Sequence, residues 1–530
     1  MLKVNNLSLR FATKTLFNEV NLEFNGNNCY GLIGANGAGK STFLKILSNE
    51  IDPTTGDVTI GKYDRMSILK QDHHSYDEYD AIQTVIMGNT KLYNIMIEKD
   101  ALYMKEDFSE ADGIKAGELE GIFAEMNGWQ AESDAAILLS GLGIDIELQS
   151  KQLKDLKDSD KVKVLLAQAL FGEPDILLLD EPTNGLDVDS KHWLEEFLIE
   201  FKNTVILVSH DRHFLNKVCT HMVDIDYNKI KMYVGNYDFW YQSSELIQKQ
   251  MRDSNKKKEE KIKELQDFIA RFSANASKSK QATSRKKSLE KIVLDEIVPS
   301  SRKYPYVNFE FEKALNNEII TLSNINYSID GKVILKNFSL NLNKDDKIAL
   351  IGQNEIAKTT LFKIITGEII PDSGTIKLGP NTKLSYFAKN HESLFLEKEN
   401  MIEWLRKYSL IKEEAFVRGF LGRMLFSGDD SLKLVNVLSG GEKVRCVLSK
   451  IMLEKPNLLI MDEPTNHLDI ESITALNNGL EKFRGSFIIS SLDEQIIETT
   501  SNRLILIRED GTYKDKYMGY QEFISKYGNK

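Results

Sequence analysis

An internal repeat constrains the fold of this 530-residue chain more than any other feature of its sequence. GLIGANGAGKSTFLKIL at 31–47 aligns with ALIGQNEIAKTTLFKII at 349–365, an offset of 318 positions. PDILLLDEPTNGLD at 174–187 aligns with PNLLIMDEPTNHLD at 456–469, an offset of 282. The first half therefore has 318 − 282 = 36 more residues between these motifs, and a duplication this long indicates two copies of one domain.

Each copy shows an apolar strand, a turn, a helix, and later a buried strand that ends in Asp-Glu. This order predicts an α/β domain with a largely parallel sheet. Both copies end alike, in YVGNYDFW at 233–240 and YMGYQEFI at 517–524. We therefore predict a first domain over residues 1–240, a linker over 241–316 and a second domain over 317–530.

Composition indicates a globular protein of a reducing compartment. Hydrophobic residues make up 42% and charged residues 28%, with three widely separated cysteines and no stretch of about 18 apolar residues. The N-terminus has no apolar signal core. We therefore expect a cytoplasmic protein without a membrane segment. The net charge of −11 argues against a uniformly basic nucleic-acid binder, so the distribution of charge along the chain matters.

The stretch GANGAGKST at 34–42 fits the phosphate-loop pattern G-x-x-x-x-G-K-[ST]. It lies between a predicted strand and a predicted helix, so backbone N–H groups and the helix N-terminus can face phosphate oxygens. We expect Lys40 to reach the β- and γ-phosphates of ATP and Ser41 to hold Mg²⁺. The ATP-binding residues predicted in this loop are Gly34, Asn36, Gly37, Gly39, Lys40, Ser41 and Thr42.

The acidic pair after the strand ILLLD at 176–180 supplies the remaining chemistry. The strand carries Asp180 toward the Mg²⁺ shell, and Glu181 can polarise the attacking water. The alternative, a strand that simply ends in an acidic turn, is disfavoured by the phosphate loop upstream. The two motifs together predict an ATPase that uses Mg²⁺.

The signature LSGGEKVR at 438–445 and the DEPTN-x-LD motif in both halves resemble the ATP-binding-cassette superfamily. Two cassettes with a charged linker resemble the ABC-F proteins, and the linker FIARFSANASKSKQATSRKKSLEKI resembles the YbiT-type branch. The resemblance implies two tandem cassettes that pair head to tail within a monomer. Each ATP then lies between the phosphate loop of one cassette and the signature of the other.

The resemblance to ABC-F proteins implies a role for each residue of the first half that matches one of their motif positions. The resemblance implies that Phe11 stacks on the base and that Gln71 senses Mg²⁺ and the attacking water. It also implies that His210 is the switch histidine near the γ-phosphate, and that Asp187 communicates with the opposite site. From the second half, Ser439, Gly440 and Gly441 of the intact signature would complete this ATP site.

The second half has lost several of these groups. At the offset of 318, Phe11 aligns with Ile329, Gly37 with Glu355, Gly39 with Ala357 and Gln71 with Lys389; at 282, His210 aligns with Leu492. We predict weak or absent nucleotide and no hydrolysis at this degenerate site. Its retained residues are Gly352, Asn354, Lys358, Thr359, Thr360, Asp462, Glu463 and Asp469.

The signatures show the opposite pattern. The second half has an intact LSGGE, whereas the first half has LKDSD at 156–160, where Asp158 would repel a phosphate. Head-to-tail pairing explains both losses, because the damaged phosphate loop and the damaged signature would form the same site. The sequence therefore predicts one complete and one retired site.

Positive charge is concentrated in the linker. Residues 245–313 contain 17 Lys/Arg and 11 Asp/Glu, a net of +6, which leaves −17 for the rest of the chain. Apolar residues at helical spacing predict two antiparallel helices with a basic tip. A charge run is usually a solvated face, but a basic tip on an acidic protein favours contact with RNA. The RNA-binding candidates are Lys278, Lys280, Arg285, Lys286 and Lys287.

The resemblance implies that the linker reaches the P-site tRNA when the protein occupies the ribosomal exit site. The extra segment at about 88–135 corresponds to an arm that can touch ribosomal components; an enlarged helical subdomain is an equally good interpretation. We thus expect a ribosome-associated ATPase that modulates translation. The alternatives are an ATP-binding transporter subunit, a ribosome-protection factor in antibiotic resistance, and a module in which ATP only holds a shape.

Overall fold

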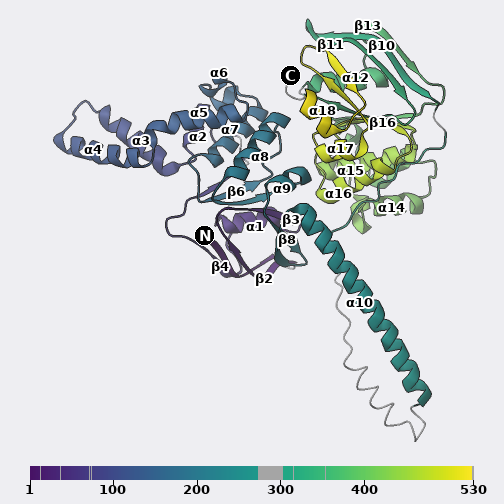
Figure 1. Cartoon of the computed structure of the whole chain (residues 1–530), viewed down its shortest axis with the longest axis horizontal. Helices are drawn as coiled ribbons and strands as arrows, with labels where there is room; N and C mark the ends of the chain where they lie inside the picture. Colours follow the sequence, from purple (N-terminus) through teal and green to yellow (C-terminus); the bar gives the residue numbers. More distant parts are fainter. Residues whose placement is uncertain are drawn as a thin grey trace.

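A computed structural model of the chain describes residues 1–11, 14–35, 37–70, 72, 74–272, 302–313, 316–352 and 354–527. Within this part, each half contains one six-stranded sheet and one three-stranded antiparallel sheet. The predicted fold class is confirmed: the chain is an α/β protein with two tandem cassettes (Figure 1).

In the first cassette the six-stranded sheet has the order β5-β6-β7-β3-β8-β9, parallel except for the edge strand β9. The second sheet has the order β2-β1-β4. The strands are β1 (Leu2–Phe11), β2 (Lys14–Phe24), β3 (Asn28–Gly34), β4 (Thr55–Ile60), β5 (Met66–Ile68), β6 (Ile176–Asp180), β7 (Thr204–Val208), β8 (His221–Asp226) and β9 (Lys229–Val234). The helices are α1 (Lys40–Leu47), α2 (Ala81–Ile86), α3 (Thr90–Tyr103), α4 (Glu110–Glu125), α5 (Ala131–Gly141), α6 (Ile146–Gln149), α7 (Asp158–Leu170), α8 (Val188–Glu200) and α9 (Arg212–Val218).

The second cassette repeats this topology, with the orders β14-β15-β16-β12-β17-β18 and β11-β10-β13. Its strands are β10 (Glu318–Ile329), β11 (Lys332–Asn343), β12 (Lys347–Ile351), β13 (Ser373–Leu378), β14 (Leu384–Phe387), β15 (Leu458–Asp462), β16 (Ser486–Ser490), β17 (Arg503–Ile507) and β18 (Tyr513–Lys516). Its helices are α12 (Glu355–Thr366), α13 (Met401–Tyr408), α14 (Glu414–Arg423), α15 (Gly440–Glu454), α16 (Ile470–Lys482), α17 (Glu494–Thr500) and α18 (Tyr520–Tyr527).

The central strands of the six-stranded sheets position the residues of the candidate nucleotide sites. β6, β7 and β15 are almost wholly apolar and buried, which is the pattern of parallel strands covered on both faces. Parallel strands bring their carboxyl ends to one edge of the sheet, where ligands bind in open α/β folds. Gly34, Asp180 and Val208 end three adjacent strands there, so the residues after them meet at one edge.

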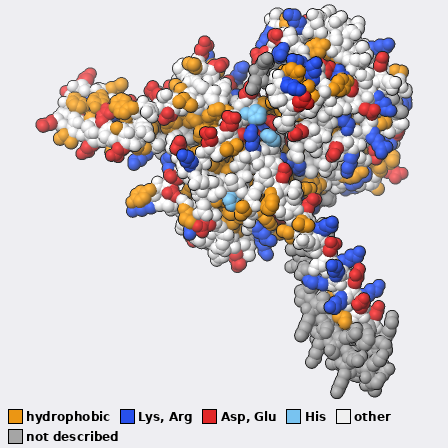
Figure 2. Space-filling model, viewed as in Figure 1, with side chains coloured by type: hydrophobic (Ala, Val, Ile, Leu, Met, Phe, Trp, Pro, Cys, Tyr) orange, Lys and Arg blue, Asp and Glu red, His pale blue; other side chains and the backbone are white. Residues whose placement is uncertain are grey.

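Two segments project from the cassettes in Figure 1. Helices α3 and α4 pair and extend away from cassette one, within the segment predicted as an arm or subdomain. Helix α10 (Tyr237–Phe272) leaves the cassettes as one long helix, and Figure 2 shows both basic and acidic side chains along it. The segment predicted to form a second linker helix and a basic tip, with Lys278, Lys280, Arg285, Lys286 and Lys287, lies outside the described residues.

No helix in the described part of the chain combines the length and apolar character needed to cross a membrane.

Candidate nucleotide sites

The phosphate loop of cassette one has the backbone that its glycines allow. Gly37 and Gly39 have φ angles of 76° and 101°, a region that favours glycine. A Cβ on Gly39 would lie 2.8 Å from the ring of Phe17, and one on Gly34 would lie 2.7 Å from the carbonyl oxygen of Ile225. Side chains at these positions would therefore obstruct the loop. Asn36 lies outside the described residues.

Lys40 begins α1, and its Nζ donates a hydrogen bond of 2.9 Å to the carbonyl oxygen of Gly34. Burial lowers the pKa of Lys40, while the nearby carboxylates of Glu471, Glu181 and Asp469 oppose that shift. The cation thus lies among acids from both cassettes. Phosphate oxygens could replace the single carbonyl that it now contacts.

The acid and the histidine predicted to act on water are adjacent. Glu181 follows β6 with a φ of 53°, and its Oε2 accepts a hydrogen bond of 3.2 Å from the backbone N–H of His210. The Nε2 of His210 lies 3.2 Å from Oε1 of Glu181. That oxygen is buried and has no well-oriented donor among the described residues, so it can accept from a water.

Burial shifts the pKa values of Glu181 and His210 so that the neutral form of each group is favoured. It raises the pKa of Glu181 to about 7, and it lowers the pKa of His210 to about 4, with a further lowering from Lys40. Near neutral pH the site therefore holds a carboxyl group poised to exchange a proton beside a neutral imidazole.

Side chains whose oxygen atoms suit Mg²⁺ stand next to Glu181 and Lys40 in the sequence. Asp180 ends β6, and Ser41 and Thr42 follow Lys40 in the first turn of α1. A carboxylate and a hydroxyl are ligands that Mg²⁺ prefers, so the described groups fit the ion. The third predicted metal contact, Gln71, lies outside the described residues, as does the side chain of Phe11 at the end of β1.

In cassette two a helix has replaced the phosphate loop. Helix α12 starts at Glu355, which aligns with Gly37, whereas α1 starts at Lys40; the helix is longer by one turn. The side chain of Asn354 caps it and accepts a hydrogen bond of 3.0 Å from the N–H of Ala357. Two backbone donors of this turn, the N–H groups of Ala357 and Lys358, are thus engaged by Asn354 instead of facing a phosphate.

The remaining groups of this site satisfy one another. Nζ of Lys389 lies 2.6 Å from Oε2 of Glu355, and Oγ1 of Thr359 donates to Oδ2 of Asp462 at 2.6 Å. Lys358 and Thr360, both within α12, are buried, and Gly352 lies against the carbonyl oxygen of Ile507. Groups of this site that could face magnesium or nucleotide therefore pair with each other.

Glu463 has a different environment from its counterpart Glu181. The hydroxyl of Ser490 donates to its Oε1 at 3.2 Å, and the N–H of Leu492 donates to Oε2 at 3.2 Å. The first cassette has Val208 in place of Ser490, a difference that the offset alignment could have revealed. Among the described residues, the Oε1 atom of Glu181 therefore has no protein hydrogen-bond donor, whereas the equivalent atom of Glu463 has one.

The intact signature is built around its glycines. Ser439 caps α15 in a reciprocal arrangement with Glu442. A Cβ on Gly440 would lie 3.0 Å from the ring of His467, and one on Gly441 would lie 2.8 Å from the carbonyl oxygen of His467.

At the equivalent positions of cassette one, the small and the large residue are exchanged. Asp158 stands at the position of Gly440 and Gly185 at the position of His467. The larger residue thus stands in the signature in cassette one and after the DEPTN motif in cassette two.

A cavity of about 930 Å³ separates the cassettes. Its lining includes Lys157 and Ser159 of the degenerate signature, Glu355 of the degenerate phosphate loop, and Lys389, which stands at the position of Gln71. It also reaches Glu181 and His210 of the first site, and His467, which packs against Gly440. Elements of opposite cassettes therefore face each other across this space.

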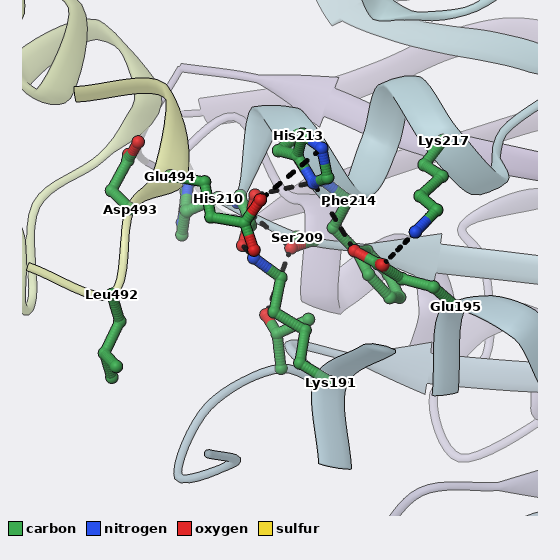
Figure 3. A network of polar contacts seen from close by, with 12 residues as sticks. Lys191, Glu195, Ser209, His210, His213, Phe214, Lys217, Leu492, Asp493 and Glu494 are labelled. Atoms are coloured by element: carbon green, nitrogen blue, oxygen red, sulfur yellow. Dashed lines mark hydrogen bonds and ion pairs between the residues drawn. The ribbon is translucent and has the colours of Figure 1, made fainter. Parts of the chain in front are cut away.

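A polar network joins the cassettes beside the cavity (Figure 3). His192 and His213 each lie between Glu195 of cassette one and Glu494 of cassette two, at 3.0 to 3.6 Å. Hydrogen bonds to Glu195 raise the pKa of both histidines. Burial alone would raise the pKa of Glu195, but His192, His213 and Lys217 hold it well below its usual range.

Comparison with known proteins identifies the family. The profile described as ABC transporter matches residues 17–184 and 335–466, and a related profile matches residues 223–309. The chain is 61% identical over 526 residues to the uncharacterized ABC transporter ATP-binding protein YkpA of Bacillus subtilis, covering 99% of this chain and 97% of that one. It is 44% identical over 522 residues to the probable ATP-binding protein YbiT of Escherichia coli O157:H7, covering 97% and 98%. The chain belongs to the ABC-F family, in its YbiT-type branch.

The tandem arrangement of this ABC-F protein also occurs in a solved structure. RNase-L Inhibitor superposes with a TM-score of 0.63 at 16% identity, covering 99% of this chain and 93% of that one. At that identity the likeness concerns the fold.

Proposed function

We propose that this ABC-F protein is a cytoplasmic, ribosome-associated ATPase in which one nucleotide site hydrolyses ATP and the other is retired. The cassettes close on ATP bound at the first site, and hydrolysis releases them. The linker contacts P-site tRNA from the ribosomal exit site, so that the nucleotide cycle modulates translation.

The contrast between Glu181 and Glu463 supports this assignment most directly. Both are buried acids after equivalent strands, but among the described residues only Glu181 has a carboxylate oxygen without a protein hydrogen-bond donor, which leaves that oxygen open to a water. Beside Glu181 the phosphate loop keeps its glycines, whereas beside Glu463 it has become the first turn of α12.

The residues of the first site suit distinct tasks in hydrolysis. Glu181 would accept the proton of the attacking water, and the neutral imidazole of His210 would contact the γ-phosphate. Lys40 and the loop amides would stabilise negative charge on the phosphates. Ser41, Asp180 and Gln71 would hold Mg²⁺, which would shield that charge while it is bound.

The raised pKa of Glu181 gives a pH dependence. Below about 7 this carboxyl group is largely protonated and cannot accept a proton, so kcat/KM for ATP should increase as pH rises through about 7. Steady-state ATPase assays from pH 5.5 to 9 would measure this. A rate that falls over the same interval would contradict the assignment of Glu181 as the base.

The charge of the linker supports a ribosomal partner. Acidic cassettes repel RNA, and the net charge of +6 over residues 245–313 directs the contact to the linker. Sedimentation of the Glu181→Gln variant with ribosomes through sucrose tests the proposal: we expect ATP-dependent co-sedimentation. Recovery with membranes instead would favour a transporter subunit.

Salt dependence tests the five RNA-binding candidates. Replacing Lys278, Lys280, Arg285, Lys286 and Lys287 with Gln should weaken ribosome binding and reduce the slope of log K against log salt by about 3.5–4.5, since each phosphate contact contributes about 0.7–0.9. A matched control replaces five exposed lysines of cassette two: Lys332, Lys336, Lys344, Lys377 and Lys516. Equal slopes for both variants would refute the role of the linker.

A further inference from the structure

Arg302 lies where the linker returns to the cassettes, and its guanidinium is shared by both. Nη2 lies 2.6 Å from Oδ1 of Asp224, on β8 of cassette one. Nε lies 3.1 Å from Oε1 of Glu471, in the first turn of α16 of cassette two. The guanidinium also stacks 4.6 Å from the ring of Trp240, on the helix that enters the linker.

This cluster is buried. The side chains of Arg302, Asp224 and Glu471 are 9%, 12% and 8% exposed. The indole Nε1 of Trp240 donates a further hydrogen bond of 3.2 Å to Asp224. Since a buried charge needs a compensating partner, removing the cation leaves two buried acids without the charge that they share.

One of these acids acts on the first ATP site. Glu471 comes two residues after Asp469, which caps α16 through a hydrogen bond of 2.8 Å to the N–H of Ser472. Burial lowers the pKa of Lys40; among the charged groups, the carboxylate of Glu471 opposes this shift most, and the guanidinium of Arg302 adds to it. The influence of Asp224 on the pKa of Lys40 is smaller than that of each of these groups. The same guanidinium therefore contacts one acid with a large influence on the phosphate-binding lysine and one with a smaller influence.

We propose that Arg302 is a positioning residue for the first ATP site, which neutralises Glu471 so that Lys40 of the opposite cassette is available to the phosphates of ATP. Without Arg302, the negative charge of Glu471 competes for Lys40 and repels the phosphates. The effect is on binding of the nucleotide and not on the chemical step.

Arg302 also connects this site to the linker, because it follows the last basic candidate, Lys287, by 15 residues. This part of the inference rests on the proposed function.

Steady-state ATPase kinetics without ribosomes test the inference. The Arg302→Met variant should raise KM for ATP about 10-fold and keep kcat within about twofold, because it weakens ground and transition states alike. The Arg302→Lys variant keeps the charge and should stay near the unaltered KM. It also preserves the test if Arg302→Met is poorly folded, since an unstable variant would lose kcat as well.

Two double variants separate positioning from structural support. Arg302→Met with Glu471→Gln should restore KM to within about twofold of the unaltered chain. Arg302→Met with Asp224→Asn removes the other orphaned acid and should leave KM high. Equal rescue by both, or by neither, would overturn the inference, because the effect would not depend on the charge of Glu471.

Arg503 offers a matched control. It is also buried, pairs with Asp346 and Asp515, and stacks 4.7 Å from the ring of Tyr517 in cassette two. The Arg503→Met variant should lose thermal stability without a change in KM. A raised KM there would show that any disrupted arginine cluster has this effect. Absence of ATP turnover in the unaltered chain would instead refute the proposed function.

Discussion

The Glu181→Gln variant should hydrolyse ATP at least about 100-fold more slowly than the unaltered chain, which is the lower range expected for loss of a general base. Gln has nearly the same shape but cannot accept a proton. The N–H of His210 can still donate to the side-chain oxygen, so the loop geometry should persist. Phosphate release in single-turnover and steady-state assays measures the loss.

The equivalent change in cassette two is the control. Glu463 is buried, and its φ angle of 51° is close to the 53° of Glu181. The two substitutions therefore change similar local structures. We expect Glu463→Gln to keep the rate of ATP hydrolysis within about twofold of the unaltered chain. A site that does not hydrolyse ATP contributes nothing to this rate, so the loss of its acid should not lower it. Losses of equal size in the two variants would mean that both sites turn over.

The second large effect concerns nucleotide binding. The Lys40→Met variant should lose ATP binding by at least about 100-fold, because several charge-assisted hydrogen bonds to phosphates disappear, each of about 1.5–3 kcal/mol. Its Nζ donates to the carbonyl oxygen of Gly34, a contact that phosphate oxygens would replace. Isothermal titration with Mg·ATP measures the affinity.

Lys358→Met is the matched change in cassette two. Lys358 is only 4% exposed and lies in a helix whose start has replaced the phosphate loop. We expect this variant to bind ATP like the unaltered chain. If Lys358→Met abolished binding while Lys40→Met did not, the assignment of the two sites would be reversed.

Much of the architecture follows from the repeat. Strand β6 could be predicted because ILLLD is a short apolar run bounded by turns, and α1 because it follows a phosphate loop. The loss of glycines at Glu355 and Ala357 indicated a damaged site. These inferences depend on local patterns that are read along the chain.

The features that the sequence could not predict depend on contacts between distant segments. That α12 gains a turn and is capped by Asn354 requires knowing the backbone around Glu355. The pairing of Glu355 with Lys389 joins residues 34 positions apart. Arg302 has no motif, and its importance arises only because the linker returns between Asp224 and Glu471.

Counting nucleotides on the Glu181→Gln variant tests the central claim, the asymmetry of the two sites, most directly. The protein would be saturated with Mg·ATP, freed of unbound nucleotide, denatured, and its nucleotide quantified against protein concentration. We predict about one ATP per chain, lost in the Lys40→Met background and retained in the Lys358→Met background. Two tightly held ATP molecules per chain would contradict the retirement of the second site.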